Sequence, residues 1–375
     1  MFTTAFLAFS LAAAPVPPEK PRPPLLTPKE ISEGWIALFD GVTTFGWEAS
    51  AGEEKGAEKP ELTIQGGCLR LVGSGGGRAR PTIWLREFEV ELEYRNPASE
   101  FEPICKVGIG IRGASYTTFM IKSEWTKWTG KWSRDKYVVT NGERRSTIEH
   151  LFFGPPCALA ISLPEHHKAT VELRNVKLRP LGTQSLFNGK NLDGWKAFQG
   201  DPKRTATKFE VTKDGELSAK NGPGDLQTEK QFDDFVLQLE CKTLGKGLDS
   251  GVFFRCIPDQ YQNGYEAQIQ NSYTVARTRP LDFGTGAIHG RFPARKVVSD
   301  DNQWFTMTLV AHGNHFATWV NGYQTVDWTD DRKANEDPRQ GLRTAKGHLS
   351  IQGNDPTTDL LFRNIRITEI PQAEK

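Results

Sequence analysis

The chain has 375 residues, a length that predicts two domains of ordinary size. Its 47 lysine and arginine residues nearly balance 46 aspartate and glutamate residues, so no charged field is available to attract nucleic acid or an anionic membrane. Glycine (36) and tryptophan (10) are frequent and methionine (3) is scarce, which favours many short strands with glycine turns over a helical bundle.

The first 14 residues have the features of an export signal. Phe2 to Ala14 is apolar or small throughout and ends in an A-x-A-like cleavage pattern, although no lysine or arginine precedes it. This segment is too short to span a bilayer, which needs about 20 apolar residues, and no later segment is apolar enough. Residues 15–30 contain seven prolines and indicate an extended linker. We therefore expect a periplasmic or extracellular protein; the alternative is a disordered start.

The five cysteines include no C-x-x-C pair, so the sequence supports neither a zinc finger nor thioredoxin-like chemistry. An odd number without a disulfide framework favours small buried core residues.

Four segments recur in the same order along the chain, as expected for two copies of one domain. The matching pairs are 38–41 with 186–189, 88–93 with 235–240, 109–112 with 252–255, and 173–178 with 362–367. The boundary lies near Gly182, which divides the chain into domains at 31–181 and 182–375.

The strand pattern is mostly of period two. In 235–240, apolar Phe235, Leu237 and Leu239 alternate with the residues between them, and 316–321 alternates in the same way. Asn321-Gly322 and Asn141-Gly142 are hairpin turn signals because both residue types tolerate positive φ. Many strands with such turns predict an all-β protein, a sandwich or jelly roll.

The second copy carries a run of motifs that together resemble one family. They are Leu186–Trp195, Asp249–Arg255, Gly264–Ile269, Thr285–Ile288, Trp319–Gly322 and Phe362–Ile367. The set is similar to the 3-keto-disaccharide hydrolase domain, a concanavalin-like jelly roll, over about residues 184–370. The first copy keeps only the opening, the arginine strand and the closing strand. The resemblance implies two tandem jelly-roll β-sandwich domains, of which the first is degenerate.

The resemblance also implies action on a carbohydrate, an oxidised di- or oligosaccharide or glycoside with a ketone at C3. That ketone acidifies the C2 proton, so a base can remove it and the C1 oxygen can leave, after which water can add. An enzyme must then supply a base, a donor for the enolate oxygen and a clamp for the ring hydroxyls. No organic cofactor is expected, no histidine spacing indicates a metal site, and a structural calcium ion stays open.

Within 264–270, alternation places Glu266, Gln268 and Gln270 on one face. A row of polar side chains suits the concave face of a jelly roll, and the alternative is a solvated outer face. The related stretch of the first copy, 118–122, has no carboxylate. We therefore assign any chemistry to the second copy, with Glu266 as the catalytic base and Gln268 as a substrate ligand.

Two further candidates flank this strand. Arg255 ends the neighbouring strand, where a guanidinium can bind a ring hydroxyl or stabilise an enolate; its alternative is a structural salt bridge to Glu266 or Asp249. His289 follows a glycine-rich loop and is a second proton-transfer candidate, because its ordinary pKa lies close to working pH. The alternative for His289 is a wall position.

One departure from the resembled family concerns the segment 351–355. Asn354 stands where relatives typically have a histidine, and Asn271 stands where an aspartate is common. Amides can bind sugar hydroxyls but are not useful bases. Asn354, Asn271 and Gln352 are therefore predicted substrate ligands, and a non-catalytic carbohydrate-binding protein or a cell-surface interaction module remains an alternative to an enzyme.

Two other hypotheses carry less support from the residues. Trp125, Trp128 and Trp132 of the first copy are candidates for a sugar-stacking platform, with core packing as the alternative. A glycosidase with paired carboxylates is disfavoured because no second carboxylate shares the strand face of Glu266.

Overall fold

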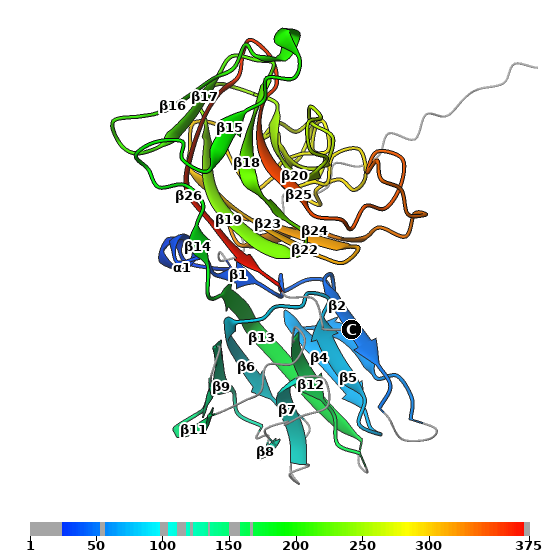
Figure 1. Cartoon of the computed structure of the whole chain (residues 1–375). Helices are drawn as coiled ribbons and strands as arrows, with labels where there is room; N and C mark the ends of the chain where they lie inside the picture. The colour runs from blue at the N-terminus through cyan, green and yellow to red at the C-terminus, as the bar shows by residue number, and fades with distance from the viewer. Residues whose placement is uncertain are drawn as a thin grey trace, which may run out of the picture.

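The structure is a computed structural model that describes residues 25–52, 57–97, 104–110, 118–120, 123–133, 136–149, 158–165 and 168–370. The predicted signal segment 1–14, most of the predicted linker, Arg112 and Cys157 lie outside these ranges. Strands of the described residues form four antiparallel sheets, paired into two sandwiches (Figure 1). The prediction of an all-β protein with two tandem sandwiches is confirmed.

The first sandwich pairs an eight-stranded sheet with a five-stranded one, counted over the described residues. The larger sheet contains β1 (Ile36–Ala37), β3 (Glu61–Gln65), β4 (Cys68–Gly73), β6 (Phe88–Arg95), β9 (Thr126–Ser133), β10 (Lys136–Asn141), β11 (Arg144–Glu149) and β13 (Ala169–Pro180). The smaller sheet contains β2 (Trp47–Ser50), β5 (Arg78–Pro81), β7 (Ile104–Gly110), β8 (Thr118–Met120) and β12 (Ala158–Ser162).

The second sandwich also pairs an eight-stranded with a five-stranded sheet. The larger sheet contains β14 (Gln184–Ser185), β16 (Lys208–Val211), β17 (Leu217–Lys220), β19 (Phe235–Thr243), β22 (Phe305–His312), β23 (His315–Val320), β24 (Tyr323–Thr329) and β26 (Asp359–Glu369). The smaller sheet contains β15 (Trp195–Ala197), β18 (Gly224–Phe232), β20 (Ser250–Cys256), β21 (Tyr265–Ile269) and β25 (Gly347–Gly353). A short 3₁₀ helix, η1 (Pro202–Arg204), follows β15.

The two sandwiches have the same strand order. The larger sheets run β3-β4-β13-β6-β9-β10-β11 and β16-β17-β26-β19-β22-β23-β24, with β1 beside β13 and β14 beside β26. The smaller sheets run β2-β5-β12-β7-β8 and β15-β18-β25-β20-β21. Strands β14 to β26 thus repeat β1 to β13 in order. The predicted limits of the two domains stay predictions.

Local details repeat as well. In β13, Asn175 has φ 51° at a bulge, and Asn364 has φ 52° at the corresponding bulge of β26. Each asparagine amide donates to a glutamate of the neighbouring strand, Asn175 to Glu93 at 3.0 Å and Asn364 to Glu240 at 2.6 Å. Asparagine tolerates the left-handed conformation, so the repeated sequence motif reflects the same bulge conformation in both strands.

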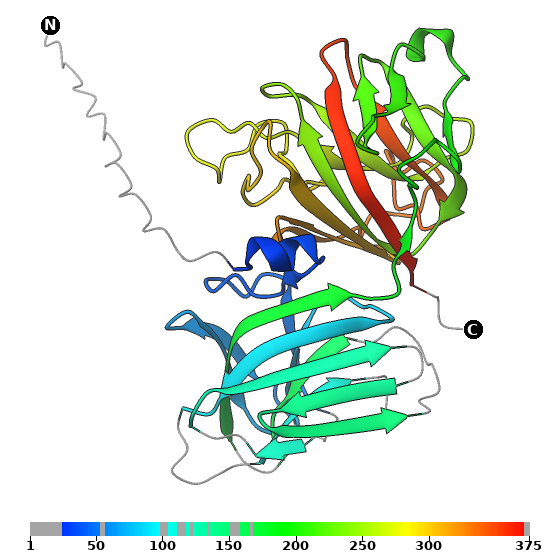
Figure 2. The same ribbon diagram turned by 90° about the vertical axis from the view of Figure 1, so that its left-hand side faces the viewer.

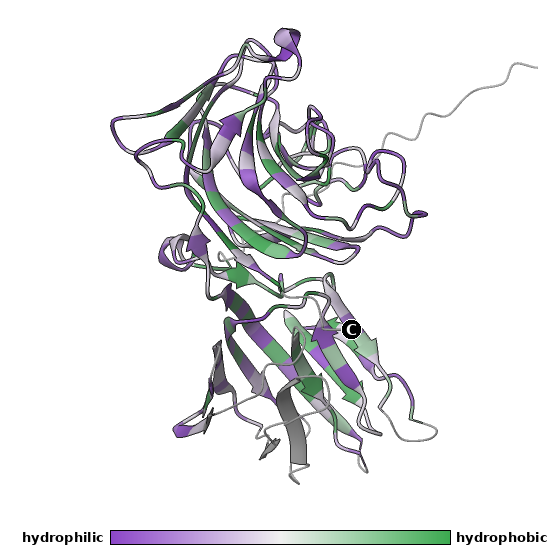
Figure 3. Ribbon diagram, viewed as in Figure 1, coloured by the Kyte–Doolittle hydropathy of each residue, from purple (hydrophilic) through white to green (hydrophobic). Residues whose placement is uncertain are grey.

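Side-chain alternation explains how the strands form the cores. Along β6 every second residue, beginning with Phe88, is buried, and Figure 3 shows hydrophobic and hydrophilic residues alternating along the strands. In β19, Phe235, Leu237 and Leu239 join the core of the second sandwich, as predicted. At the β23–β24 hairpin, Asn321 and Gly322 have φ 49° and 75°, which confirms the predicted turn.

The end of the predicted linker is folded, because its apolar residues have a surface to cover. Leu26 is 3% exposed and packs with Trp35 and Ala37. Thr27 caps α1 (Pro28–Ser32), a short helix that lies with β1 between the sandwiches (Figures 1 and 2). The prediction of an extended linker up to residue 30 is therefore wrong from Leu25 onward.

The first sandwich covers the outward face of the second sandwich's larger sheet. Trp319 is 1% exposed and its indole nitrogen donates to the Ala37 carbonyl at 2.9 Å. Arg295 bonds Asp40 at 2.8 Å, which helps to lower the pKa of that carboxyl against the opposing effect of burial. Outward-facing residues of the sheet that share the core cluster of the first sandwich are Val236, Val310, Ala317 and Trp319. A ligand of the second sandwich must therefore bind elsewhere.

In the described part of the chain, no helix is long and apolar enough to cross a bilayer. Cys68, Cys241 and Cys256 are buried free thiols, as predicted for core cysteines.

Candidate active site

A cavity of about 450 Å³ opens on the outward face of the smaller sheet of the second sandwich. Strands β20, β21 and β25 form its floor. Their inward side chains, among them Val252, Ala267 and Ile351, belong to the core, and the alternating residues Phe253, Glu266 and Gln352 face the cavity. Loops around residues 289–291 and 338–339 form the walls.

Glu266 lies at the centre of this floor, with its side chain 11% exposed. The neighbouring strand makes room for it with a glycine, because a Cβ at Gly251 would lie 2.6 Å from Glu266 Cγ. Tyr265, which precedes Glu266, is anchored in the core and donates its hydroxyl to Asp330 at 2.7 Å. The carboxylate is therefore held on a rigid strand, which suits a group that transfers protons.

His289 bridges two carboxylates. Its Nδ1 lies 3.2 Å from Glu266 Oε2 and its Nε2 lies 3.3 Å from Asp282 Oδ1. The ring also packs edge-on against Phe283, with centroids 5.1 Å apart. Asp282 and Phe283 both have positive φ, 42° and 65°, a strained conformation for residues other than glycine that is frequent at functional sites.

These contacts decide the charge states of the pair. The hydrogen bond to Glu266 raises the pKa of His289 from 6.5 to about 9, so the ring is an imidazolium at neutral pH. Burial raises the pKa of Glu266, and the hydrogen bond from His289 opposes that shift. His289 is thus suited to donate a proton or to stabilise negative charge, and Glu266 is the better candidate for the base.

Asp249 is a second carboxylate in the same cavity. Its Oδ1 accepts from Gln268 Nε2 at 2.9 Å and its Oδ2 accepts from Asn354 Nδ2 at 3.0 Å. Burial and, next, the nearby Asp282 and Glu266 carboxylates raise the pKa of Asp249 to about 6. Because Asp249 and Asp282 come from outside β21, the argument from the strand face of Glu266 missed both carboxylate neighbours.

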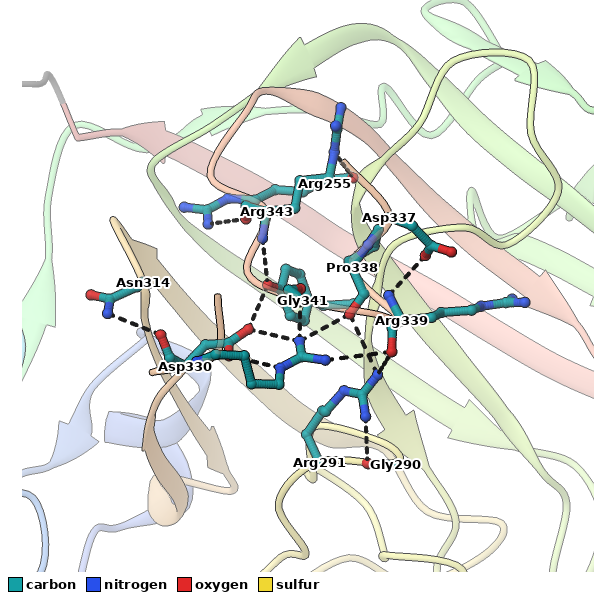
Figure 4. Close-up of polar contacts among 12 residues, drawn as sticks. Arg255, Gly290, Arg291, Asn314, Asp330, Asp337, Pro338, Arg339, Gly341 and Arg343 are labelled. Atoms are coloured by element: carbon teal, nitrogen blue, oxygen red, sulfur yellow. Dashed lines mark hydrogen bonds and ion pairs between the residues drawn. The ribbon is translucent and has the colours of Figure 1, made fainter. Parts of the chain in front are cut away.

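The wall opposite is a loop held by arginines (Figure 4). Arg332 forms two hydrogen bonds of 2.8 Å with Asp330 and donates to the carbonyls of Pro338 and Gly341, both at 2.9 Å. Arg291 donates to the carbonyl of Arg339 at 2.5 Å. The loop brings Arg339 to the cavity, where its Nη2 donates to the Gln262 carbonyl at 2.7 Å.

Arg255 is not in the cavity, and the prediction that it binds substrate is wrong. Its side chain is fully buried and pairs with Asp234 at 2.8 Å. The remaining nitrogens donate to the carbonyls of Asp233, Gly313 and Arg343 at 3.0, 2.7 and 2.9 Å. Arg255 therefore has the structural role that was the alternative prediction, but its salt-bridge partner is Asp234 rather than Glu266 or Asp249.

Asn271 is also outside the cavity. It is 6% exposed, its Nδ2 donates to Asp301 at 3.0 Å, and its Oδ1 accepts from Thr285 and Ser299 at 2.6 and 2.5 Å. These partners replace any sugar hydroxyl, so the predicted ligand role of Asn271 is wrong.

The structure brings together five of the seven predicted site residues: Glu266, Gln268, His289, Gln352 and Asn354. Sequence reasoning missed Asp249, Asp282, Phe253 and Arg339. Asp249 and Phe253 lie in the Asp249–Arg255 motif and could have been recognised by alternation with buried neighbours. Asp282 and Arg339 lie in loops and left no local signal.

The tryptophans of the first sandwich do not form the proposed stacking platform. Trp128 and Trp132 are 0% and 5% exposed and belong to its core. Trp125 is covered by Arg174, whose guanidinium carbon lies 4.0 Å from the ring centroid.

Comparison with known proteins agrees with the geometry. The profile of the 3-keto-alpha-glucoside-1,2-lyase-like domain matches residues 182–368. A 3-keto-disaccharide hydrolase of Bacteroides thetaiotaomicron is 33% identical over 72 residues, which cover 17% of this chain and 24% of the relative. The chain thus spans about a quarter of the length of that curated relative.

Among solved structures, a glycosyl hydrolase candidate from Parabacteroides distasonis shares 22% identity and a TM-score of 0.42, covering 51% of this chain and 94% of that one. The carbohydrate-binding module CBM66 of Bacillus subtilis shares 16% identity and a TM-score of 0.33, covering 48% of this chain and 97% of that one.

The polar cavity with its carboxylates and the match at residues 182–368 together indicate a carbohydrate-active protein. Residues 182–368 of this chain match the 3-keto-alpha-glucoside-1,2-lyase-like domain, which confirms the family resemblance predicted for the second sandwich.

Proposed function

We propose that the second sandwich cleaves 3-keto-glycosides, by elimination or by net hydrolysis. The observation that carries this proposal is the Glu266–His289 pair, in which a largely buried carboxylate lies 3.2 Å from an imidazole nitrogen and raises the pKa of that ring. A base beside a fixed positive charge is what enolisation requires, because the charge stabilises the oxyanion that proton removal creates.

The proposed reaction begins with removal of the C2 proton by Glu266. The electrons of the C2–H bond move to the C3 oxygen as an enolate, which the His289 imidazolium and the Arg339 guanidinium stabilise. When the enolate collapses, C1 and C2 become doubly bonded and the C1–oxygen bond breaks. The departing oxygen takes a proton from an acid of the cavity. Addition of water across the C1–C2 double bond would complete net hydrolysis.

The lining suits a sugar in the cavity. Phe253 lines the floor and contributes an apolar group there, with 5% of its surface exposed. Gln268, Gln352 and Asn354 provide amides for ring hydroxyls.

The test is to incubate purified protein with methyl 3-keto-α-glucoside, aryl 3-keto-glucosides and their unoxidised parents, and to follow release of the aglycone. Release from the keto compounds alone, abolished in Glu266→Gln, is the expected result. Release from the parents, or undiminished turnover in Glu266→Gln, would refute the proposal. Asp355→Asn, in a turn next to Asn354, is a matched carboxylate control and should keep activity.

A non-catalytic carbohydrate-binding protein is the second candidate, and one observation favours it. Asn354 stands where a histidine is typical of the resembled family, and its side chain forms hydrogen bonds with Asp249 and Gln352. In that case the keto-glucosides bind saturably, none is cleaved, and Glu266→Gln binds about as well as the original protein.

We also propose that the protein is exported to the periplasm or the extracellular space. The apolar segment 2–14 with its small-residue end supports this location. Expression with the native N-terminus and sequencing of the mature protein would test it: an intact Met1 in the cytoplasmic fraction would refute it.

A further inference from the structure

Two buried oxygens of the cavity residues have no hydrogen-bond partner within the described part of the chain. They are Gln268 Oε1 and Gln352 Oε1, on side chains that are 1% and 7% exposed. Buried acceptors normally find donors, so a pair of such oxygens in one cavity requires a reason.

The reason lies in the direction of a chain of amides that starts at Asp249. A carboxylate only accepts, so Asn354 must point its Nδ2 at Asp249, 3.0 Å away, which turns its Oδ1 toward Gln352. Gln352 then donates Nε2 to that Oδ1 at 3.3 Å. Its Oε1 is left without a donor.

The second branch of the chain is fixed even more firmly. Gln268 Nε2 faces Asp249 at 2.9 Å and Asp282 Oδ2 at 2.7 Å, and it also reaches the Asp282 carbonyl at 3.2 Å. Three acceptors on one side leave no alternative orientation, so Gln268 Oε1 is also left free.

We propose that Asp249 is a positioning residue, which orients the amides so that Gln268 and Gln352 present acceptor oxygens to two hydroxyl groups of the bound sugar. This inference rests on the proposed function and adds its specificity: the ligand carries hydroxyl donors, and groups that only accept are rejected at these two places. A ligand that fills the cavity supplies the hydrogen-bond donors that these two buried oxygens lack.

The variant Asp249→Asn separates this role from simple structural support. Gln268 stays fixed by Asp282, so the introduced asparagine must turn its oxygen to Gln268 and its NH₂ to Asn354. Asn354 then flips, Gln352 flips after it, and Gln352 presents a donor in place of an acceptor. A single isosteric change thus inverts the hydrogen-bond polarity at one place in the cavity and leaves the other unchanged.

The experiment measures binding of methyl 3-keto-α-glucoside and its 2-, 4- and 6-deoxyfluoro analogues by calorimetry, in the Glu266→Gln background to prevent turnover. Fluorine accepts weakly and cannot donate. With Asp249 unchanged, we expect the protein to bind at least one fluorinated analogue about tenfold more weakly than the parent sugar. In Asp249→Asn, affinity for the parent falls about tenfold and the discrimination at one ring position disappears.

Rescue provides the decisive arm. Adding Gln352→Glu to Asp249→Asn supplies an acceptor on both sides of residue 352, so discrimination at that ring position should return. Gln352→Leu should remove the discrimination at that ring position, because leucine offers no acceptor. The matched control is Asp193→Asn, since Asp193 also accepts from an asparagine amide, that of Asn191 at 2.8 Å, but does not line the cavity. Its analogue profile should be unchanged.

The outcomes are distinct. An Asp249→Asn profile identical to that of the Asp249 protein overturns the positioning role and leaves the proposed function standing. A profile altered equally by Asp193→Asn also overturns it, because the effect is then not specific to the cavity. Absence of binding to any keto-glucoside overturns the proposed function and this inference together.

Discussion

Replacing Arg255 by methionine should destabilise the protein severely and leave substrate affinity unchanged. The guanidinium is fully buried, pairs with Asp234 at 2.8 Å, and joins the end of β20 to the turn before β19, the β22–β23 hairpin and the Arg343 segment. Removing one partner of a buried ion pair leaves an uncompensated charge and typically costs about 3–5 kcal/mol.

Methionine fills similar space, so the loss measures the charge and its hydrogen bonds rather than a cavity. For a sandwich of this size, a loss of about 3–5 kcal/mol lowers the midpoint of thermal unfolding by roughly 6–20 °C. Changing Asp234 to asparagine in the same protein should recover part of the loss, because the buried carboxylate charge is then removed as well.

The assay is denaturant and thermal unfolding of Arg255→Met beside Arg366→Met, an exposed arginine at which the cost should stay within about 0.5 kcal/mol. KM for a keto-glucoside is measured on the folded fraction. An unaltered unfolding midpoint with a raised KM would refute this reasoning and restore Arg255 as a substrate ligand.

Three further predictions concern other contacts. Since Glu266 raises the pKa of His289 to about 9, an NMR titration of the ring should have its midpoint near pH 9, and Glu266→Gln should move that midpoint down toward 6.5. The stability that the raised pKa of His289 contributes is complete below pH 6.5 and is lost as pH rises through 9. A midpoint near 6.5 in the unaltered protein would contradict the pairing. Gly251→Ala should displace the Glu266 carboxylate and lower kcat by about 10²-fold, and an unchanged kcat would contradict the close packing of these two residues. Trp319→Ala should cost about 3–5 kcal/mol in urea unfolding, and a cost below about 1 kcal/mol would show that the sandwiches barely depend on each other.

The sequence predicted the fold well because the strands obey a local rule. Period-two alternation identified the inward rows of β19 and β23, and the Asn321-Gly322 pair identified a hairpin, since both depend on neighbouring residues alone. The segment 25–30 was misjudged because proline content hides a single buried leucine, Leu26, whose role depends on the second sandwich.

Within the site, alternation succeeded along β21 and failed at Arg255. The pairing of β20 with β25 shifts register between Phe253 and Cys256, and Arg255 has φ 52°, so its side chain does not continue the alternation. Asp282 and Arg339 reach the cavity from loops whose conformations are fixed by distant partners, and no neighbouring residue announces them.

The Asn354 substitution gains a physical meaning from the structure. The resemblance predicts a histidine there, and its absence leaves a binding protein open as an alternative to an enzyme. In the folded chain Asn354 transmits the polarity of Asp249 to Gln352, a task for which an amide, with one donor end and one acceptor end, is well suited.

The apolar residues on the outward face of the larger sheet of the second sandwich limit how this chain can be divided into separate domains. Separated from residues 25–181, the second sandwich would offer Trp319 and its neighbours to water as a ready surface for self-association. The two sandwiches therefore have to be expressed together, even though the candidate site lies in the second one alone.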